Sequence, residues 1–326
     1  MKRKRMRMTG IILICLAVIF IASGCAKKES AASGSAQTGP QKYRIGALSK
    51  NNSDTFVKNI FDAVLARAAE LSNECTVTIL DAEGEIHKQI QQAEDFITQR
   101  YDAIILNPVD YEGCAPIVDM VVEAGIPIVG VNTTTTNIEK ISYVGSDDAD
   151  AGRIQAEYLR TRLQPGARIV YLEGPIGISP QIFRRQGMWE HLIDDKAMNI
   201  QVLDAQTANW KRDQAMTLTE NWLTRFNNNI DAVVCQNDDM ALGALEAIEA
   251  KGLKDKIIVI GVDAIADALT AVKAGRLDAT VFQDAAGQGR GGLDVALELL
   301  KSGQKKIPDR MIPFKAVTID NVDQFM

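Results

Sequence analysis

Short apolar runs rich in β-branched residues alternate with longer segments of helical period from residue 43 to the end of the chain. Nearly continuous apolar runs of this length are typical of strands that are buried on both faces of a parallel sheet. Nine segments show the pattern. We predict strands at 43–48, 76–82, 103–108, 127–132, 167–174, 200–206, 232–238, 257–263 and 279–284.

Between these runs, apolar residues recur at i, i+3 and i+4, as on the buried face of an amphipathic helix. The clearest case comprises Val57, Ile60, Phe61, Val64, Leu65 and Ala68. Gly-containing segments such as EAGIP at 123–127 end these helices before the next strand. Regular strand–helix alternation predicts an α/β fold with a doubly wound parallel sheet.

The predicted strands are too numerous for one small sheet, and the alternation breaks at 141–152, where a strand-like piece leads into a helix. We therefore predict two similar doubly wound parallel-sheet lobes, joined by several short strands that form a hinge behind a cleft. The first lobe is expected to comprise 43–146 and 284–306, and the second 147–283 and 307–326.

The N-terminal segment lies outside this pattern. It has a basic start, an apolar run at 11–22 and the small-residue sequence ASGC at 22–25, as in a secretory signal peptide. The apolar run is shorter than the roughly 20 residues that a membrane-spanning helix needs. We predict a signal peptide over 1–24 and a flexible Ser/Ala/Gly-rich tether over 25–42.

Charge and cysteine usage exclude several functions. Loss of the five basic residues of the signal peptide would change the formal charge from −6 to −11. Nucleic-acid binding is not expected of so acidic an exported protein. Cys75, Cys114 and Cys235 show no CxxC spacing and are expected to be buried and free. His87 and His191 lie far apart, so no zinc site is expected.

Amides and carboxylates recur where the predicted strands end. In open α/β folds these carboxyl ends face the ligand crevice. The residues are Asp54, Asn107, Asn132, Asn237, Asp263 and Gln283. Amides donate and accept hydrogen bonds and carboxylates accept them, which suits the adjacent hydroxyls of a polyol. Each residue alone could be a turn former or helix cap, but the recurrence favours a ligand site.

Two aromatic residues extend this hypothesis. Phe56 and Trp210 lie in loops after the first and sixth predicted strands, where their rings could stack on the C–H faces of a sugar. The alternative for Trp210 is a lid over the local core. Arg184 or its neighbour Arg185 could donate a planar pair of hydrogen bonds to ligand oxygens. The other arginine is then expected to be a solvated charge on the helix surface.

Two further motifs have local explanations. In CQNDDMALGAL, 235–245, we expect Asp238 or Asp239 to cap the following helix, which leaves Asn237 for the ligand. GQGRGG, 287–292, lacks the spacing of a dinucleotide fingerprint and is interpreted as the Gly-rich start of a helix. No cofactor is expected.

From Tyr43 onward the chain resembles the periplasmic sugar-binding proteins of bacterial ABC transporters, in the ribose/galactose-binding class. The resemblance rests on the sequences at 143–159, 236–252 and 260–284. It implies a type I periplasmic-binding-protein fold and a monomer that delivers a sugar to ABC permease subunits. ASGC also resembles a lipobox, with Ala22 in place of the usual leucine, which implies that Cys25 is lipidated and anchors the protein to the membrane.

Within this class the galactose/glucose type is the most similar. Its ligand residues are matched by Asp54, Phe56, Asn132, Arg184, Trp210, Asn237 and Asp263, while Gln283 stands where that type has Asn and the ribose type has Gln. Ile178 and Pro180 replace a His and an Asp, which removes two polar contacts and creates an apolar wall. The resemblance thus implies a hexose such as galactose or glucose, or a cyclic polyol such as inositol.

Other differences from the galactose and ribose types affect the expected metal binding and the expected ligand. The calcium loop of the galactose type is missing, since only RTRLQPGAR at 160–168 connects helix and strand, so no metal site is expected. Asn132 and Thr133 replace the Asp–Arg pair of the ribose type. Two alternatives remain: a sugar-sensing receptor for a membrane signalling kinase or chemotaxis receptor, and a cleft glycosidase that uses Asp54 and Asp263 as its two carboxylates.

Overall fold

The computed structural model describes residues 42–326. The predicted signal peptide, Cys25 and nearly all of the predicted tether lie outside the described residues. The described chain belongs to one compact unit. None of its helices combines the length and the apolar character needed to cross a membrane.

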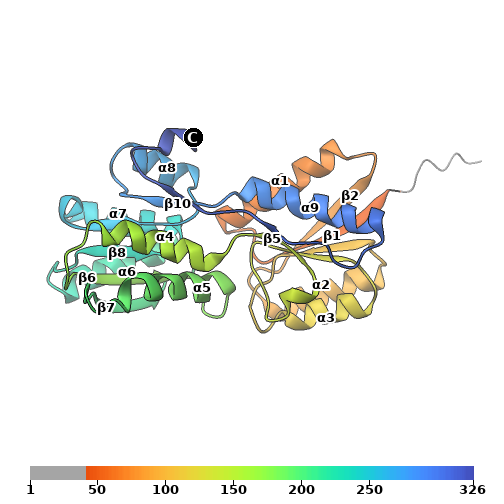
Figure 1. Cartoon of the computed structure of the whole chain (residues 1–326), viewed down its shortest axis with the longest axis horizontal. Coiled ribbons are helices and arrows are strands. Elements are labelled where there is room, and N and C mark those ends of the chain that lie inside the picture. Colours follow the sequence, from red (N-terminus) through yellow and green to blue (C-terminus); the bar gives the residue numbers. More distant parts are fainter. Residues whose placement is uncertain (1–41) are drawn as a thin grey trace, which may run out of the picture. The chain divides into compact units, whose positions relative to one another are not determined.

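The first lobe is built on a six-stranded sheet in which all neighbouring strands are parallel. Its strand order is β11-β5-β4-β3-β1-β2 (Figure 1). The bounds are β1 (Tyr43–Ser49), β2 (Cys75–Asp81), β3 (Ala103–Leu106), β4 (Ile128–Val131), β5 (Ser142–Gly145) and β11 (Arg310–Met311).

Helices cover both faces of this sheet. α1 (Thr55–Glu70) and α9 (Ala285–Ser302) pack on one face, and α2 (Ile86–Thr98) and α3 (Ala115–Glu123) on the other (Figure 1). The Gly-rich segment 287–292 lies at the start of α9, as predicted. A Cβ atom at Gly289 would lie 2.1 Å from the Ile60 carbonyl oxygen, so this glycine permits the close approach of α9 to α1.

The second lobe repeats the arrangement with a four-stranded parallel sheet in the order β7-β6-β8-β9. Apolar side chains of α6, α7 and α8 pack on one face, and those of α4 and α5 on the other. The strands are β6 (Arg168–Glu173), β7 (Gln201–Thr207), β8 (Ala232–Cys235) and β9 (Ile258–Ile260). The helices are α4 (Asp148–Arg160), α5 (Ser179–Met188), α6 (Arg212–Arg225), α7 (Asp238–Ala250) and α8 (Ala266–Lys273).

The pairing of β10 and the place where the second lobe resumes near the C-terminus differ from the prediction. β10 (Thr280–Phe282) pairs antiparallel with β12 (Lys315–Val317), and only isolated bridges join it to the segment of β9. The second lobe was predicted to resume at residue 307, but β11 still pairs with β5 of the first sheet. The boundary lies later because the Ser142 hydroxyl exchanges hydrogen bonds with the backbone of Ile307.

All nine predicted strands are present, and the chain passes between the lobes three times, after β5, β10 and β11 (Figure 1). The two-lobed α/β prediction is therefore confirmed. Parallel strands that share a sheet bring their carboxyl ends to the same edge. The polar residues that follow β1, β4, β8 and β9 are consequently positioned along these edges.

Candidate ligand-binding site

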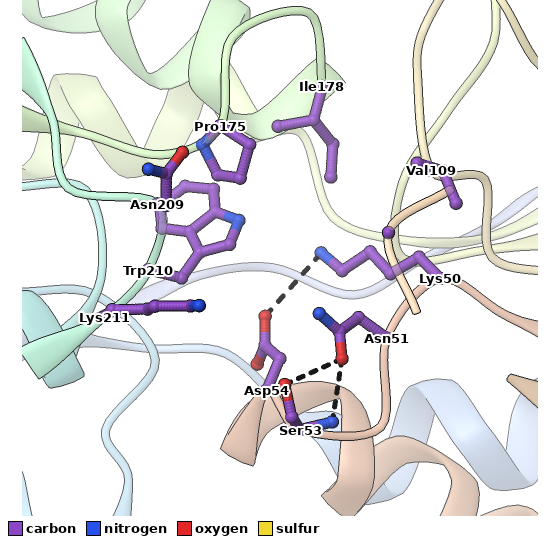
Figure 2. A pocket seen from close by; sticks show the side chains of 11 residues that line it. Lys50, Asn51, Ser53, Asp54, Val109, Pro175, Ile178, Asn209, Trp210 and Lys211 are labelled. Atoms are coloured by element: carbon purple, nitrogen blue, oxygen red, sulfur yellow. Dashed lines mark hydrogen bonds and ion pairs between the residues drawn. The ribbon is translucent and has the colours of Figure 1, made fainter. Parts of the chain in front are cut away.

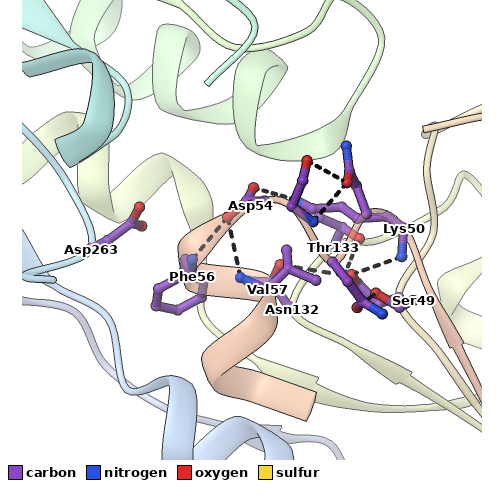
Figure 3. Close-up of polar contacts among 12 residues, drawn as sticks. Ser49, Lys50, Asp54, Phe56, Val57, Asn132, Thr133 and Asp263 are labelled. Carbon is purple, nitrogen blue, oxygen red and sulfur yellow. Dashed lines mark hydrogen bonds and ion pairs between the residues drawn. The ribbon is translucent and has the colours of Figure 1, made fainter. Parts of the chain in front are cut away.

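Ten side chains from both lobes line one small cavity, which we call the inner cavity. It contains all eight residues of the main sequence prediction. Lys50, Asp54, Phe56 and Asn132 come from the first lobe, and Pro180, Arg184, Trp210, Asn237, Asp263 and Gln283 from the second. Figure 3 shows how Phe56 and Asn132 lie in relation to Asp263.

Arg184 is the central cation of the second-lobe side. It projects from α5, is only 4% exposed, and donates through Nε to Asp148 (3.1 Å) and through Nη2 to Gln283 Oε1 (3.1 Å). Its Nη1 donates to the Gln236 carbonyl and lies 3.8 Å from Asp263 Oδ1. Arg185 instead pairs with Glu173 and stacks on Trp189. Arg184 is therefore the arginine of the cavity.

The two carboxylates beside Arg184 have perturbed proton affinities. Burial raises the pKa of Asp148, and the Arg184 guanidinium opposes this rise. Burial also raises the pKa of Asp263 well above its ordinary range, again against the effect of Arg184. Within residues 42–326 the Asp263 carboxylate accepts no hydrogen bond, so it is available as an acceptor for a ligand hydroxyl.

Asp263 is held in an unusual backbone conformation. Its φ is 120° and that of Ala264 is 57°, which are uncommon values for residues other than glycine. Asp238, at the start of α7, accepts hydrogen bonds from the Thr280 hydroxyl (2.6 Å) and the Ile265 amide (3.0 Å). These bonds tie the segment that carries Asp263 to α7 and fix the direction of its carboxylate.

Two lining residues are also helix caps. Asp54 Oδ1 accepts from the amides of Phe56 (2.9 Å) and Val57 (3.2 Å) at the start of α1 (Figure 3). Asn237 Oδ1 accepts from the Met240 amide (3.0 Å) at the start of α7. Each thus keeps one polar atom free of its cap, Asp54 Oδ2 and Asn237 Nδ2.

The prediction that Asp238 or Asp239 caps this helix is wrong. The cap is Asn237, because its extended backbone (φ −146°, ψ 171°) precedes the first helical residue. Asp238 points instead toward Thr280, and Asp239 pairs with Arg212. Asn237 therefore caps α7 and also lines the inner cavity.

The two aromatic side chains come from opposite lobes. Phe56 is nearly buried at the start of α1, and the Trp210 ring is partly buried against the core of the second lobe. Trp210 covers this core and also lines the cavity. Its Nε1 is buried and has no hydrogen-bond partner among the described residues, so it is an available donor.

Asn107 does not line the inner cavity, which contradicts its inclusion among the candidate ligand residues. It is fully buried, and its Nδ2 donates to the Val131 carbonyl (3.1 Å) and the Thr133 hydroxyl (2.8 Å). Its Oδ1 accepts from the Lys50 amide (3.4 Å). Asn107 thereby links the ends of β1, β3 and β4 behind the cavity.

A second cavity, the outer cavity, adjoins the inner one, and Lys50, Asp54 and Trp210 line both. Figure 2 shows its lining, which includes the apolar residues Ile178 and Pro175. Its volume is about 170 Å³, against about 20 Å³ for the inner cavity. The inner cavity has room for only one or two water-sized molecules, so a ring fits there only if the lobes lie farther apart than in this structure.

The lobes contact each other directly beside these cavities. The Tyr111 amide donates to the Gly177 carbonyl (2.8 Å), and the Thr134 amide donates to the Ser179 hydroxyl (2.9 Å). Two hydrogen bonds of this kind contribute about 1 kcal/mol each. Contacts of that strength are compatible with reversible opening of the cleft.

The three cysteines of the described part of the chain form no disulfide. Cys75, Cys114 and Cys235 are buried and free, as predicted. From residue 42 onward no group of three or more His, Cys, Asp or Glu side chains is arranged to hold a metal ion.

Sequence reasoning missed Lys50 as a lining residue. It directly follows β1, where a polar loop was recognised but only its later residues were singled out. The signal that could have identified it is its place as the first residue after a buried strand, four residues before Asp54.

Substitution of Gly174 by alanine is expected to weaken ligand binding at least tenfold. The new Cβ would lie 2.0 Å from Cζ2 of Trp210, so the ring must move out of the position in which it lines the cavity. Titration calorimetry on Gly174→Ala measures the loss. In a Trp210→Ala background, Gly174→Ala should reduce the affinity little further, because the ring with which the new Cβ clashes is absent. If Gly174→Ala reduced the affinity by the same factor with and without Trp210, this explanation would be contradicted.

The ligand-free protein is expected to lose stability as the pH rises from about 4 to about 7. Burial raises the pKa of Asp238 to about 7, whereas the unfolded value is about 3.9. The folded state therefore binds more protons in this window, and stability falls as the pH rises through it. Melting temperatures of wild type and Asp238→Asn between pH 4 and 8 test this. The melting temperature of the variant should fall less steeply with pH than that of wild type. Asp148 and Asp263, whose pKa values are also raised by burial, should account for the pH dependence that remains. Equal slopes would contradict it.

Comparison with known proteins gives a consistent family assignment. Residues 45–305 match the model of the periplasmic binding protein domain. A xylitol-binding protein of Mycolicibacterium smegmatis is 38% identical over 74% of this chain and 68% of its own length. An ABC transporter solute-binding protein of Bacillus halodurans with bound myo-inositol is 38% identical, with a TM-score of 0.82 over 87% of this chain and 97% of its own.

A myo-inositol-binding protein of Caulobacter, also with bound myo-inositol, is 32% identical. Its TM-score is 0.82 over 87% of this chain and 96% of that one. At these identities the similarity extends beyond the fold to the class of protein.

Proposed function

Since the chain belongs to the periplasmic binding protein family, in the sugar-binding class that serves ABC transporters, we propose that it captures a cyclic polyol between its two lobes. Proteins of this class are extracytoplasmic binding proteins and not enzymes. The observation that carries the proposal is the convergence of nine polar and aromatic side chains, from both lobes, on the inner cavity.

The lining suits a ring that carries many hydroxyls. Phe56 and Trp210 offer apolar faces for C–H groups, and Asp263 offers an acceptor. Asn237 Nδ2 and Trp210 Nε1 offer donors. A ligand that lacks one matching hydroxyl leaves a buried polar group unpaired, at a cost of about 1–3 kcal/mol. Such an analogue should bind roughly ten- to hundredfold more weakly.

We favour a cyclitol of the myo-inositol type over a hexose. Both solved relatives compared above were crystallised with myo-inositol. Ile178 and Pro180 place apolar side chains where the galactose type has polar ones, and Pro180 lines the inner cavity itself. The alternative is a galactose- or glucose-binding protein, which a comparison of the affinities for myo-inositol, galactose and glucose distinguishes from a cyclitol-binding protein.

Capture is proposed to proceed by closure of the lobes about the three connecting segments. The ligand needs only to bind the closed form better than the open one, because contacts from both lobes exist together only when the cleft is closed. The closed, loaded monomer would then be the form that the permease recognises. Residues 147–283 and the C-terminal segment are proposed to move as one lobe.

Attachment to the membrane through a lipid on Cys25 completes the proposal. The lipobox-like sequence at 22–25 supports it. Cys25→Ser should release the protein from the membrane fraction without changing its affinity for the ligand. Retention of the variant in the membrane fraction would rule out the lipid anchor and leave the binding function unaffected.

Titration calorimetry against myo-inositol, galactose, glucose, xylose and ribose tests the ligand class. We expect one-to-one binding that is tightest for myo-inositol and is lost in Asp263→Ala. Tightest binding of galactose or glucose would replace the cyclitol by a hexose. Absence of binding across the panel would refute the proposed ligand class while leaving the family assignment intact.

A further inference from the structure

Lys50 is buried in the cleft, but its side chain forms no hydrogen bond with any described residue. It directly follows β1, is 7% exposed, and lines both the inner and the outer cavity. Figure 2 shows its ammonium in the space between Asp54, Trp210 and Ile178. Throughout 42–326 only one carboxylate oxygen approaches it closely, Asp54 Oδ2 at 4.0 Å, beyond hydrogen-bond distance.

Such a position is costly for an ammonium group, which normally has partners when it is buried. Burial lowers the pKa of Lys50, and the charge of Asp54 opposes this. Asp54 is not free to approach more closely, because its other oxygen accepts from the amides of Phe56 and Val57 at the start of α1. The three ammonium donors therefore point toward the cavities with their hydrogen bonds unmade.

Other available groups around the inner cavity are also donors. Trp210 Nε1 and Gln283 Nε2 are buried and have no partner in the described part of the chain. Asn237 Nδ2 remains after Oδ1 has capped α7. Against these donors, the available acceptors are the carboxylate of Asp263 and Asp54 Oδ2, the oxygen that does not cap α1. A cavity with this excess of donors complements a ligand whose oxygens accept hydrogen bonds.

We infer that Lys50 is a further ligand-binding residue that determines specificity: its ammonium donates to a hydroxyl oxygen of the bound polyol and disfavours ligands with an amino group in its place. The inference rests on the proposed function and goes beyond it. An amine at the ligand position that faces Lys50 would bring two cations together in a site shielded from water. An oxygen at the same position would instead complete the hydrogen bonding of the ammonium.

A purely structural role for Lys50 gives different consequences. If the approach to Asp54 stabilised the fold, Lys50→Met would lower the melting temperature of the ligand-free protein. If Lys50 is retained for the ligand, removal of a buried charge without hydrogen bonds should leave that temperature unchanged or raise it. In Lys50→Met the affinity for the ligand should then fall while the melting temperature of the ligand-free protein stays the same or rises.

The test compares Lys50→Met with Lys58→Met, a control on the exposed face of α1 where Lys58 pairs with Asp62. Calorimetry measures binding of myo-inositol and of a series of amino-deoxy inositols in which each hydroxyl is replaced once. Melting temperatures of the ligand-free proteins are measured in parallel.

We expect Lys50→Met to bind myo-inositol about 10- to 100-fold more weakly, with no loss of melting temperature. For at least one of the amino-deoxy inositols, wild type should bind myo-inositol at least tenfold more tightly than the amino compound. In Lys50→Met this ratio of affinities should be smaller by about threefold or more. Lys58→Met should match wild type in all respects.

Two results would overturn the inference, and they are distinguishable. If wild type binds myo-inositol and Lys50→Met retains both its affinity and its preference over the amino analogues, Lys50 is not a ligand residue although the proposed function stands. If wild type binds neither myo-inositol nor any sugar of the panel, the proposed function fails and this inference fails with it.

Discussion

Replacement of Arg184 by methionine is expected to lower the free energy of unfolding by about 3–5 kcal/mol, the usual cost of removing one partner of a buried ion pair. Arg184 and Asp148 are each about 4% exposed and are joined by a hydrogen bond of 3.1 Å. The same guanidinium also contacts Gln283 and the Gln236 carbonyl. Its loss leaves all of these groups unpaired in a dry environment, and ligand binding should be abolished.

Arg185→Met is the matched control, because Arg185 is the adjacent residue of the same helix. Its side chain is 39% exposed, and its ion pair with Glu173 lies outside both cavities. A partly exposed pair of this kind contributes at most about 1 kcal/mol. Urea denaturation of both variants measures the difference. Similar small losses for the two variants would contradict the central role of Arg184.

Replacement of Trp210 by alanine is expected to weaken ligand binding about 30- to 150-fold. A tryptophan ring offers about 150–250 Å² of contact area, and burial of one face contributes about 2–3 kcal/mol at about 25 cal/mol per Å². Trp210 lines both cavities, so it borders the proposed ligand position in the inner cavity. Calorimetry with the ligand that wild type binds most tightly measures the loss.

Trp189→Ala serves as the control for this prediction. Trp189 packs against Tyr171 and Arg185 in the second lobe and lines neither cavity. It should lower stability without changing affinity for the ligand by more than about threefold. A loss of affinity in Trp189→Ala equal to that in Trp210→Ala would indicate that both changes act through the fold of the lobe.

The sequence was sufficient to predict the fold and most of the lining of the inner cavity. Strands buried on both faces produce apolar runs that can be recognised without knowledge of their neighbours. Because the carboxyl ends of parallel strands meet at one edge, residues as distant in the chain as Asp54 and Asp263 could be assigned to one cleft. Phe56 and Trp210 followed from their loops in the same way.

The errors concern features that depend on local backbone geometry. Asn237 rather than Asp238 caps α7 because of the dihedral angles at the strand end, and these cannot be read from residue types that are all good caps. Asn107 has the same position after a strand as Asn132, but it points behind the cavity toward Val131 and Thr133. The two-residue strand β11 is too short to produce a periodic pattern.

Lys50 shows a different limit of sequence reasoning. A lysine beside a polar loop is usually solvated, and only the structure reveals that Lys50 is 7% exposed and lines the inner cavity. Under the proposed role, the buried Lys50 side chain lowers the stability of the fold and contributes to ligand binding. Residues of this kind are best found by comparing burial with hydrogen bonding.

A crystal structure of the protein with the panel compound that binds most tightly tests the account most directly. We expect the ring to lie between Phe56 and Trp210, with its oxygens within hydrogen-bond distance of Asp263, Arg184 and Lys50. Both lobes should contact the same ligand. A ligand bound outside the inner cavity, or held by one lobe alone, would contradict the proposal that closure of the two lobes captures a cyclic polyol.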